Sequence, residues 1–87
     1  AEDRLYSKGL YMSSCNWIPS APAQKEFKCK AKFRYRQEEQ GVTVRIGSDK
    51  IFVDFDEKQR AITEGQFCVL YDDEKCLGGG VIEKAIF

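Results

Sequence analysis

The stretch that decides the fold is EFKCKAKFRYR, from Glu26 to Arg36. Apolar and cationic side chains alternate through it without a break, which is typical of a β-strand with one face in a core and the other in water. At a rise of about 3.3 Å per residue, side chains on the same face stand roughly 6.6 Å apart. The inward residues are Phe27, Cys29, Ala31, Phe33 and Tyr35, and the outward residues are Lys28, Lys30, Lys32, Arg34 and Arg36.

Two hairpins are expected downstream of this strand. The same alternation recurs at residues 42–46 and 51–55, on either side of a short loop that contains Gly47, so these segments form the first hairpin. In the second hairpin, an acidic turn at 72–74 joins a strand to a partner that bends sharply at its three consecutive glycines, residues 78–80.

With one more strand between Leu10 and Trp17, the sequence predicts six strands and no helix. Short strands at intervals of about 8 to 12 residues are typical of a small barrel or sandwich. We expect a closed, Greek-key-like barrel, because closure removes the exposed edges that an open sheet of this size would leave. Residues 1–87 are expected to form a single domain, of which residues 1–8 are a linker-like start.

Composition narrows the class of protein. The 87 residues carry no net charge, but residues 1–49 hold nine basic and six acidic side chains, whereas residues 50–87 hold five and eight. Neither a secretory signal nor an apolar run long enough to cross a bilayer is visible. We therefore interpret the four cysteines as free thiols in a reducing compartment and expect no membrane partner. A chain without histidine or a CxxC pair is not expected to bind a metal.

No catalytic centre is expected. The run Gly78-Gly79-Gly80 lacks the following lysine and Ser/Thr of a phosphate-binding loop, and a strand bend explains it better. The acidic residues cluster in segments that resemble solvated turns. Two interpretations of the cationic strand face stay open: it contacts successive phosphates of RNA or another polyanion, or it is a solvated edge whose lysines prevent aggregation.

Taken together, five segments resemble the C-terminal barrel domain of the tRNA-specific 2-thiouridylase family, also called MnmA or TrmU. The resemblance covers nearly the whole chain from about Leu5. It is carried by the segments Cys15-Asn16-Trp17-Ile18, Phe33-Arg34-Tyr35-Arg36-Gln37, Ala61-Ile62-Thr63-Glu64-Gly65-Gln66, Val69-Leu70-Tyr71-Asp72 and Cys76-Leu77-Gly78-Gly79-Gly80-Val81-Ile82. The fold that it implies is a six-stranded barrel similar to the second domain of elongation factor Tu.

The resemblance implies that this is the non-catalytic part of a larger cytoplasmic enzyme that makes 2-thiouridine at the wobble position of tRNA. In that family, ATP and a persulfide sulfur donor serve an N-terminal PP-loop catalytic domain. This domain itself is expected to hold no cofactor. The implied partners are tRNA and the PP-loop domain of the same polypeptide.

The resemblance also implies RNA-contacting residues. The family's arginine-tyrosine and glutamine contacts map to Arg34, Tyr35 and Gln66, and the cationic strand adds Lys32 and Arg36. Strict alternation points Tyr35 inward, so the strand would have to bend or end there for the phenol to reach the rim. The sequence departs from the common T-P-G-Q motif by placing Glu64 where proline is usual, which puts an acid near the predicted contact.

Two other functions remain as alternatives. In the first, the barrel is a structural spacer that docks on the catalytic domain through exposed apolar residues such as Trp17 and Phe87, and fixes its orientation without binding RNA. In the second, the chain is an independent thiol-redox protein, which would need a cysteine that is reactive near neutral pH.

Overall fold

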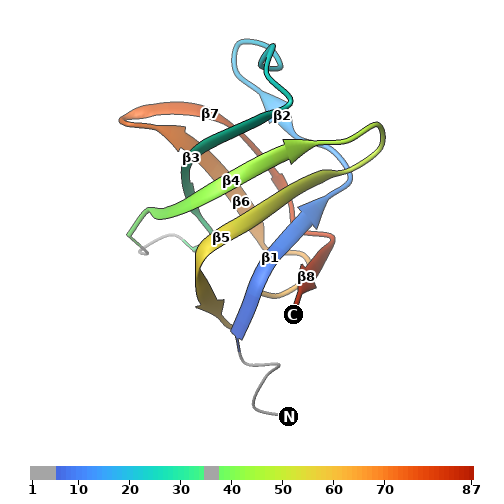
Figure 1. Ribbon diagram of the computed structural model, residues 1–87, viewed down its shortest axis with the longest axis vertical. Helices are drawn as coiled ribbons and strands as arrows, with labels where there is room; N and C mark the ends of the chain where they lie inside the picture. Colours follow the sequence, from blue (N-terminus) through green and yellow to red (C-terminus); the bar gives the residue numbers. More distant parts are fainter. Residues whose placement is uncertain (1–5, 35–37) are drawn as a thin grey trace.

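The computed structural model describes residues 6–34 and 38–87. All regular structure in these residues is antiparallel β-sheet, with no helix (Figure 1). The strands are β1 (Tyr6–Met12), β2 (Asn16–Trp17), β3 (Glu26–Lys32), β4 (Gln40–Ile46), β5 (Ile51–Arg60), β6 (Phe67–Asp72), β7 (Lys75–Val81) and β8 (Lys84–Ile86). The predicted all-β class is therefore confirmed.

The strand order is β2-β7-β6-β3-β4-β5-β1-β8. Strands β3, β4 and β5 form a meander, and β6 returns to lie beside β3, which is the arrangement of a Greek key. The two ends of the order meet because β1 pairs with β8 and β2 pairs with β7. Tyr11 faces Lys84, and Asn16, five residues after Tyr11, faces Gly79, five residues before Lys84. The sheet thus curls round on itself into a barrel (Figure 1).

The strand count differs from the six that the sequence predicted. The segment expected as one strand, residues 10–17, is interrupted between Met12 and Asn16, where the backbone passes close to Gly80. The last segment is likewise divided into β7 and β8. Strand β1 also starts earlier than expected, at Tyr6, within the stretch predicted to be linker-like. Ser7 is buried there, and its hydroxyl lies 3.4 Å from the carbonyl oxygen of Gln59.

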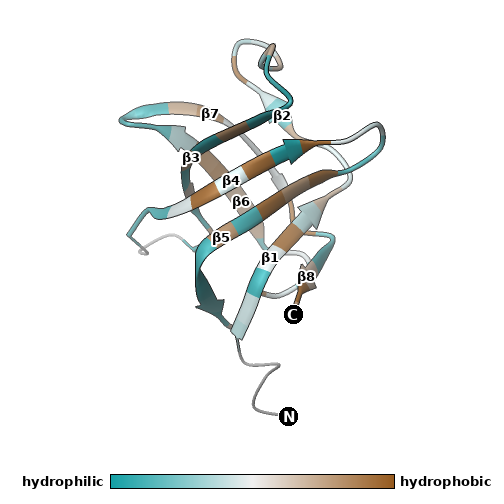
Figure 2. Ribbon diagram, viewed as in Figure 1, coloured by the Kyte–Doolittle hydropathy of each residue, from teal (hydrophilic) through white to brown (hydrophobic). Residues whose placement is uncertain are grey.

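The predicted alternation of β3 is confirmed within residues 26–34. Ala31 and Phe33 are buried, whereas Lys28, Lys30 and Arg34 are exposed. The same stripes of polar and apolar residues run along β4 and β5 (Figure 2). The regular strand ends at Lys32, and the predicted contacts Tyr35 and Arg36 lie outside the described residues.

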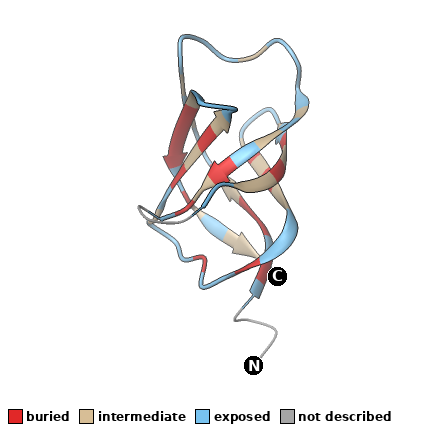
Figure 3. Ribbon diagram, turned by 90° about the vertical axis from the view of Figure 1, so that its left-hand side faces the viewer, coloured by how far each residue is buried: buried red, intermediate tan, exposed pale blue. Residues whose placement is uncertain are grey.

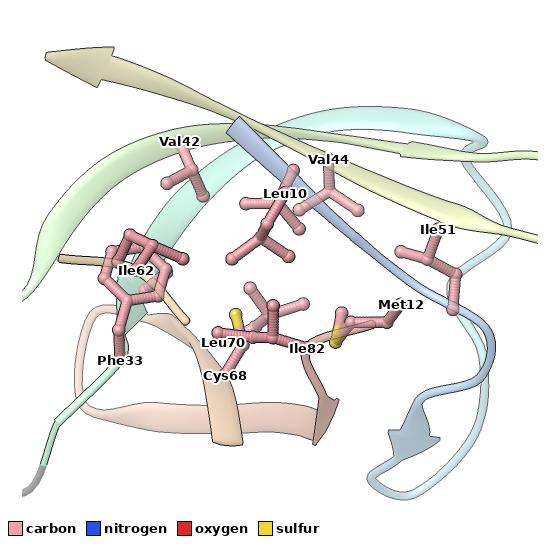
Figure 4. Packing of buried hydrophobic residues seen from close by; sticks show 12 residues of the cluster. Leu10, Met12, Phe33, Val42, Val44, Ile51, Ile62, Cys68, Leu70 and Ile82 are labelled. Atoms are coloured by element: carbon pink, nitrogen blue, oxygen red, sulfur yellow. The ribbon is translucent and has the colours of Figure 1, made fainter. Parts of the chain in front are cut away.

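The apolar faces of the strands meet in one core inside the curled sheet (Figure 3). Leu10, Leu70 and Ile82 point toward one another in its centre (Figure 4), and burying each such side chain contributes about 1.5–3 kcal/mol. At one end, the rings of Phe33 and Phe55 pack with their centroids 5.0 Å apart. This packing fixes the inward face of β3, and the cations between its apolar residues therefore point outward.

Both predicted hairpins are present. Gly47 N donates to Lys50 O in the β4–β5 turn, and Asp73 adopts a positive φ of 55° in the β6–β7 turn. The expected bend in β7 lies at Gly78, which has a φ of 144° and accompanies a register shift against β6. A side chain at this position would clash with the backbone of Asn16, so glycine allows β2 to approach β7 closely.

Candidate nucleic-acid interface

The outward face of β3 divides into two halves with different electrostatic surroundings. At the start of the strand, Lys28 Nζ lies 3.4 Å from Asp56 Oδ1. Lys28 and Lys30 share a surface hollow with Asp56, Asp72 and Asp73. These carboxylates offset the positive potential of the two lysines. This half of the predicted cationic face is therefore a mixed-charge surface and a poor site for a polyanion.

The other half of the face opens onto a groove between β3 and β6 of about 360 Å³, which we call the outer groove. Lys32 Nζ lies 5.7 Å from the centroid of the Tyr71 ring, within the range of a cation–π interaction. None of the described residues that line the outer groove is acidic. The lining residues are Lys32, Arg34, Phe67, Val69 and Tyr71.

Arg34 is held in place by the backbone of a distant segment. Its Nη2 donates hydrogen bonds of 2.8 Å to the carbonyl oxygens of Arg60 and Ala61, at the end of β5. Ala61 has a positive φ of 57°, which is uncommon for a residue other than glycine. The guanidinium therefore stabilises the start of the β5–β6 loop while it remains exposed. Because part of its freedom is already lost, Arg34 offers a fixed positive charge at the rim of the groove.

Gln66 lies at the far end of the same loop. Its Oε1 accepts a hydrogen bond of 3.1 Å from Thr63 N, and its carbonyl oxygen accepts one of 2.7 Å from Ile82 N. The loop from Ala61 to Gln66 thus begins against Arg34 and ends one residue before Phe67 of the outer groove. The structure therefore places Lys32 and Arg34 in one groove and Gln66 next to it along the chain.

Glu64 lies in the middle of this loop and lines a different hollow, with Ile62, Thr63, Ala85 and Phe87. The sequence had placed its carboxylate near the predicted contact. Glu64 is two residues from Gln66, but it is not among the residues that line the outer groove. Its charge is therefore not part of the groove wall.

Sequence reasoning missed Phe67, Val69 and Tyr71 as parts of a site. The signal was present, because Cys68 and Leu70 alternate with them and are buried, which turns the other three outward. What the sequence did not reveal is that β6 lies beside β3, so that Lys32 faces Val69 across the ladder. This pairing joins cations from one strand to aromatic rings from another.

Three of the four cysteines, Cys15, Cys29 and Cys68, show no sign of an activated thiol. Burial raises the pKa of Cys68 to about 12, and burial raises the pKa values of Cys15 and Cys29 to about 11. A reactive cysteine needs a lowered pKa. Within the described residues, no group of three or more cysteine and acidic side chains is arranged to hold a metal ion. The same part of the chain contains no helix that is long and apolar enough to span a bilayer.

Comparison with known proteins places the chain in a family. The model of the aminomethyltransferase beta-barrel domain matches residues 7–82. The chain belongs to this family. Its relatives include proteins named tRNA-specific 2-thiouridylase MnmA from Shouchella clausii, 56% identical over 81 residues, and from Exiguobacterium sibiricum, 54% identical over 82 residues. The relative of that name from Lactococcus lactis is 49% identical over 83 residues.

The alignments cover 92%, 93% and 95% of this chain, respectively, but only 22% of each relative. The chain therefore spans about a fifth of the length of these proteins. The predicted resemblance to the C-terminal barrel domain of the MnmA/TrmU family is confirmed.

Proposed function

We propose that this chain is the tRNA-contacting C-terminal domain of a tRNA-specific 2-thiouridylase. The parent enzyme would make 2-thiouridine at the wobble position, using ATP and a persulfide sulfur donor bound by its N-terminal PP-loop domain. The barrel would take no part in the chemistry and would hold tRNA for that domain. The names of the relatives support the activity of the parent, and a tRNA substrate fits a cytoplasmic location.

One observation carries the proposal for the barrel itself. Lys32 and Arg34 stand in one groove whose described lining contains no carboxylate, and the backbone bonds of Arg34 tie this groove to the loop that ends at Gln66. Cations that lack an acidic neighbour attract phosphates more strongly than the ion-paired Lys28 does. Of the three residues that the family resemblance implied, Arg34 lines the more positive half of the face and Gln66 directly precedes Phe67 of the same groove, whereas Tyr35 lies outside the described residues.

Titration of fluorescent tRNA with the chain at several salt concentrations tests this proposal. Each neutralised phosphate should contribute roughly 0.7 to 0.9 to the slope of log affinity against log salt. We expect Arg34→Ala combined with Gln66→Ala to weaken binding. Because both side chains also stabilise the loop, circular dichroism must show that the double variant is folded, and Lys32→Ala provides a variant outside the loop. The proposal would be overturned if the affinity for tRNA did not depend on salt concentration and was unchanged by all three substitutions.

The spacer function remains the second candidate, and the exposed apolar residues favour it. Phe87 is 53% exposed and lines a hollow with Ile62 and Ala85. Trp17 suits this role less well than the sequence suggested, because it is half-buried against Phe27, with the ring centroids 6.3 Å apart. Deleting the barrel from a full-length enzyme separates the two functions: lost solubility with unchanged tRNA affinity favours the spacer.

A further inference from the structure

Phe67 stands out on the surface of the outer groove. It is the first residue of β6 and is 53% exposed, whereas the next residue, Cys68, points inward and is completely buried. The ring lies across Gly79 of β7, since a Cβ on that glycine would come within 2.8 Å of Phe67 Cε2. Because Gly79 has no side chain, the Phe67 ring can pack directly on the backbone of β7, and about half of the Phe67 side chain still faces solvent.

Two cations share the outer groove with this aromatic surface. Val69 of β6 pairs with Lys32 of β3 on one side and with Gly79 of β7 on the other. The base of the groove between β3 and β7 is therefore apolar at this point. Lys32, Arg34 and Tyr71 form the remaining wall. An exposed ring beside two positive charges is the combination that proteins use to bind unpaired nucleotides, with the base on the ring and the phosphate on the cations.

We propose that the outer groove binds one unpaired nucleotide of RNA, with its base stacked on Phe67 and its phosphate contacted by Lys32 and Arg34. This inference rests on the proposed tRNA-contacting function and specifies which part of the RNA this groove takes. A paired base offers no free face to Phe67, because neighbouring base pairs cover it. The groove therefore selects a loop, a bulge or a single-stranded end over a duplex.

The charges also argue against an apolar protein segment as the occupant. An apolar partner that covered Phe67 would remove Lys32 and Arg34 from water, and the described lining supplies no carboxylate to compensate them. A phosphate compensates both charges. The same two cations that make docking of an apolar segment costly thus favour a nucleotide.

The test compares a single-stranded oligoribonucleotide with a duplex of the same sequence, by fluorescence anisotropy with the 87-residue chain. Stacking contributes about 1–3 kcal/mol per base, so Phe67→Ala should weaken single-strand binding about 5- to 150-fold. It should leave duplex binding and the salt slope unchanged. Phe67→Trp, which keeps a stacking surface, should restore the affinity.

Phe87→Ala is the matched control, because this phenylalanine is also 53% exposed but lies outside the outer groove. It should leave both affinities unchanged. If Phe67→Ala has no effect while Lys32→Ala weakens binding, the tRNA-contacting function survives and base stacking is wrong. If Phe67→Ala weakens duplex and single strand equally, the preference for an unpaired nucleotide is also wrong. If the unmodified chain binds neither RNA, the proposed function fails together with this inference.

Discussion

Arg34 Nη2 donates a 2.8 Å hydrogen bond to the carbonyl oxygen of Ala61, 27 positions further along the chain. A second bond of the same length joins Nη2 to Arg60 O. One of the two cations of the outer groove is therefore also a structural support for the β5–β6 loop. Changes at Arg34 will affect both stability and binding, and the two effects have to be measured separately.

Arg34→Met tests the structural role, because methionine keeps much of the apolar stem and removes both hydrogen bonds. We expect the free energy of unfolding in urea to fall by about 1–2 kcal/mol, since each bond contributes about 0.5–1.5 kcal/mol and the site is exposed. Hydrogen exchange at Thr63 and Gln66 should accelerate. Arg45→Met is the control, because Arg45 makes a surface ion pair with Asp54 whose loss costs less than about 1 kcal/mol. Equal losses for the two variants would contradict this role.

Ala61→Gly tests the strain at the other end of this contact. Ala61 has a φ of 57°, which glycine adopts without a steric penalty. Glycine also gives the unfolded chain more freedom, which opposes the gain. We expect the unfolding free energy to rise or to stay within about 0.5 kcal/mol of the original, measured by urea denaturation. A loss of more than about 1 kcal/mol would show that the Ala61 methyl group contributes to packing.

Gly78→Ala tests the close approach of β2 to β7. Gly78 has a φ of 144°, and an added Cβ would come within 2.9 Å of Trp17 Cα. We expect a loss of more than about 2 kcal/mol in thermal or urea unfolding, from strain and steric overlap together. Gly65→Ala separates the two causes, because Gly65 has a φ of 90° but nothing within 4 Å of its would-be Cβ. Its loss should be smaller, and a larger loss than at Gly78 would contradict the packing argument.

The thiols predict how stability depends on pH. Burial raises the pKa of Cys68 to about 12, above the ordinary value of 9.0. Between these values the unfolded state loses the thiol proton and the folded state keeps it. The unfolded state then binds fewer protons, so stability falls as pH rises through this range. Unfolding temperatures measured below pH 9 and near pH 11 should show this fall, and Cys68→Ala should reduce it.

Thiol labelling tests the same burial independently. At neutral pH, Cys15, Cys29 and Cys68 should alkylate slowly in the folded chain and rapidly after denaturation, because the thiolate is the reactive form. Rapid labelling of any of the three in the folded chain would revive the thiol-redox alternative.

The strand pattern was predictable because one face of each strand is buried. In and just after β3, Ala31 and Phe33 could only point inward, and the alternation fixed the direction of Lys32 and Arg34 as well. The division into eight strands was not predictable. It depends on where the backbone of Ser14 passes Gly80, and this contact joins segments far apart in the sequence.

The candidate site was only partly predictable for the same reason. The sequence identified a row of cations, but it did not reveal that Asp56 lies beside Lys28 whereas Tyr71 lies beside Lys32. These neighbours come from β5 and β6, so they depend on strand order. Alternation places a side chain on a face, but it does not reveal which charges surround it.

The central claim is that the binding surface lies at the Lys32 end of the cationic face and not at the Lys28 end. Lys32→Ala and Lys28→Ala remove the same charge from the same face of the same strand. In tRNA titrations over a range of salt, Lys32→Ala should weaken binding and lower the log–log salt slope by roughly 0.7 to 0.9, while Lys28→Ala should change neither. Equal effects of the two variants, or a larger effect of Lys28→Ala, would contradict this account.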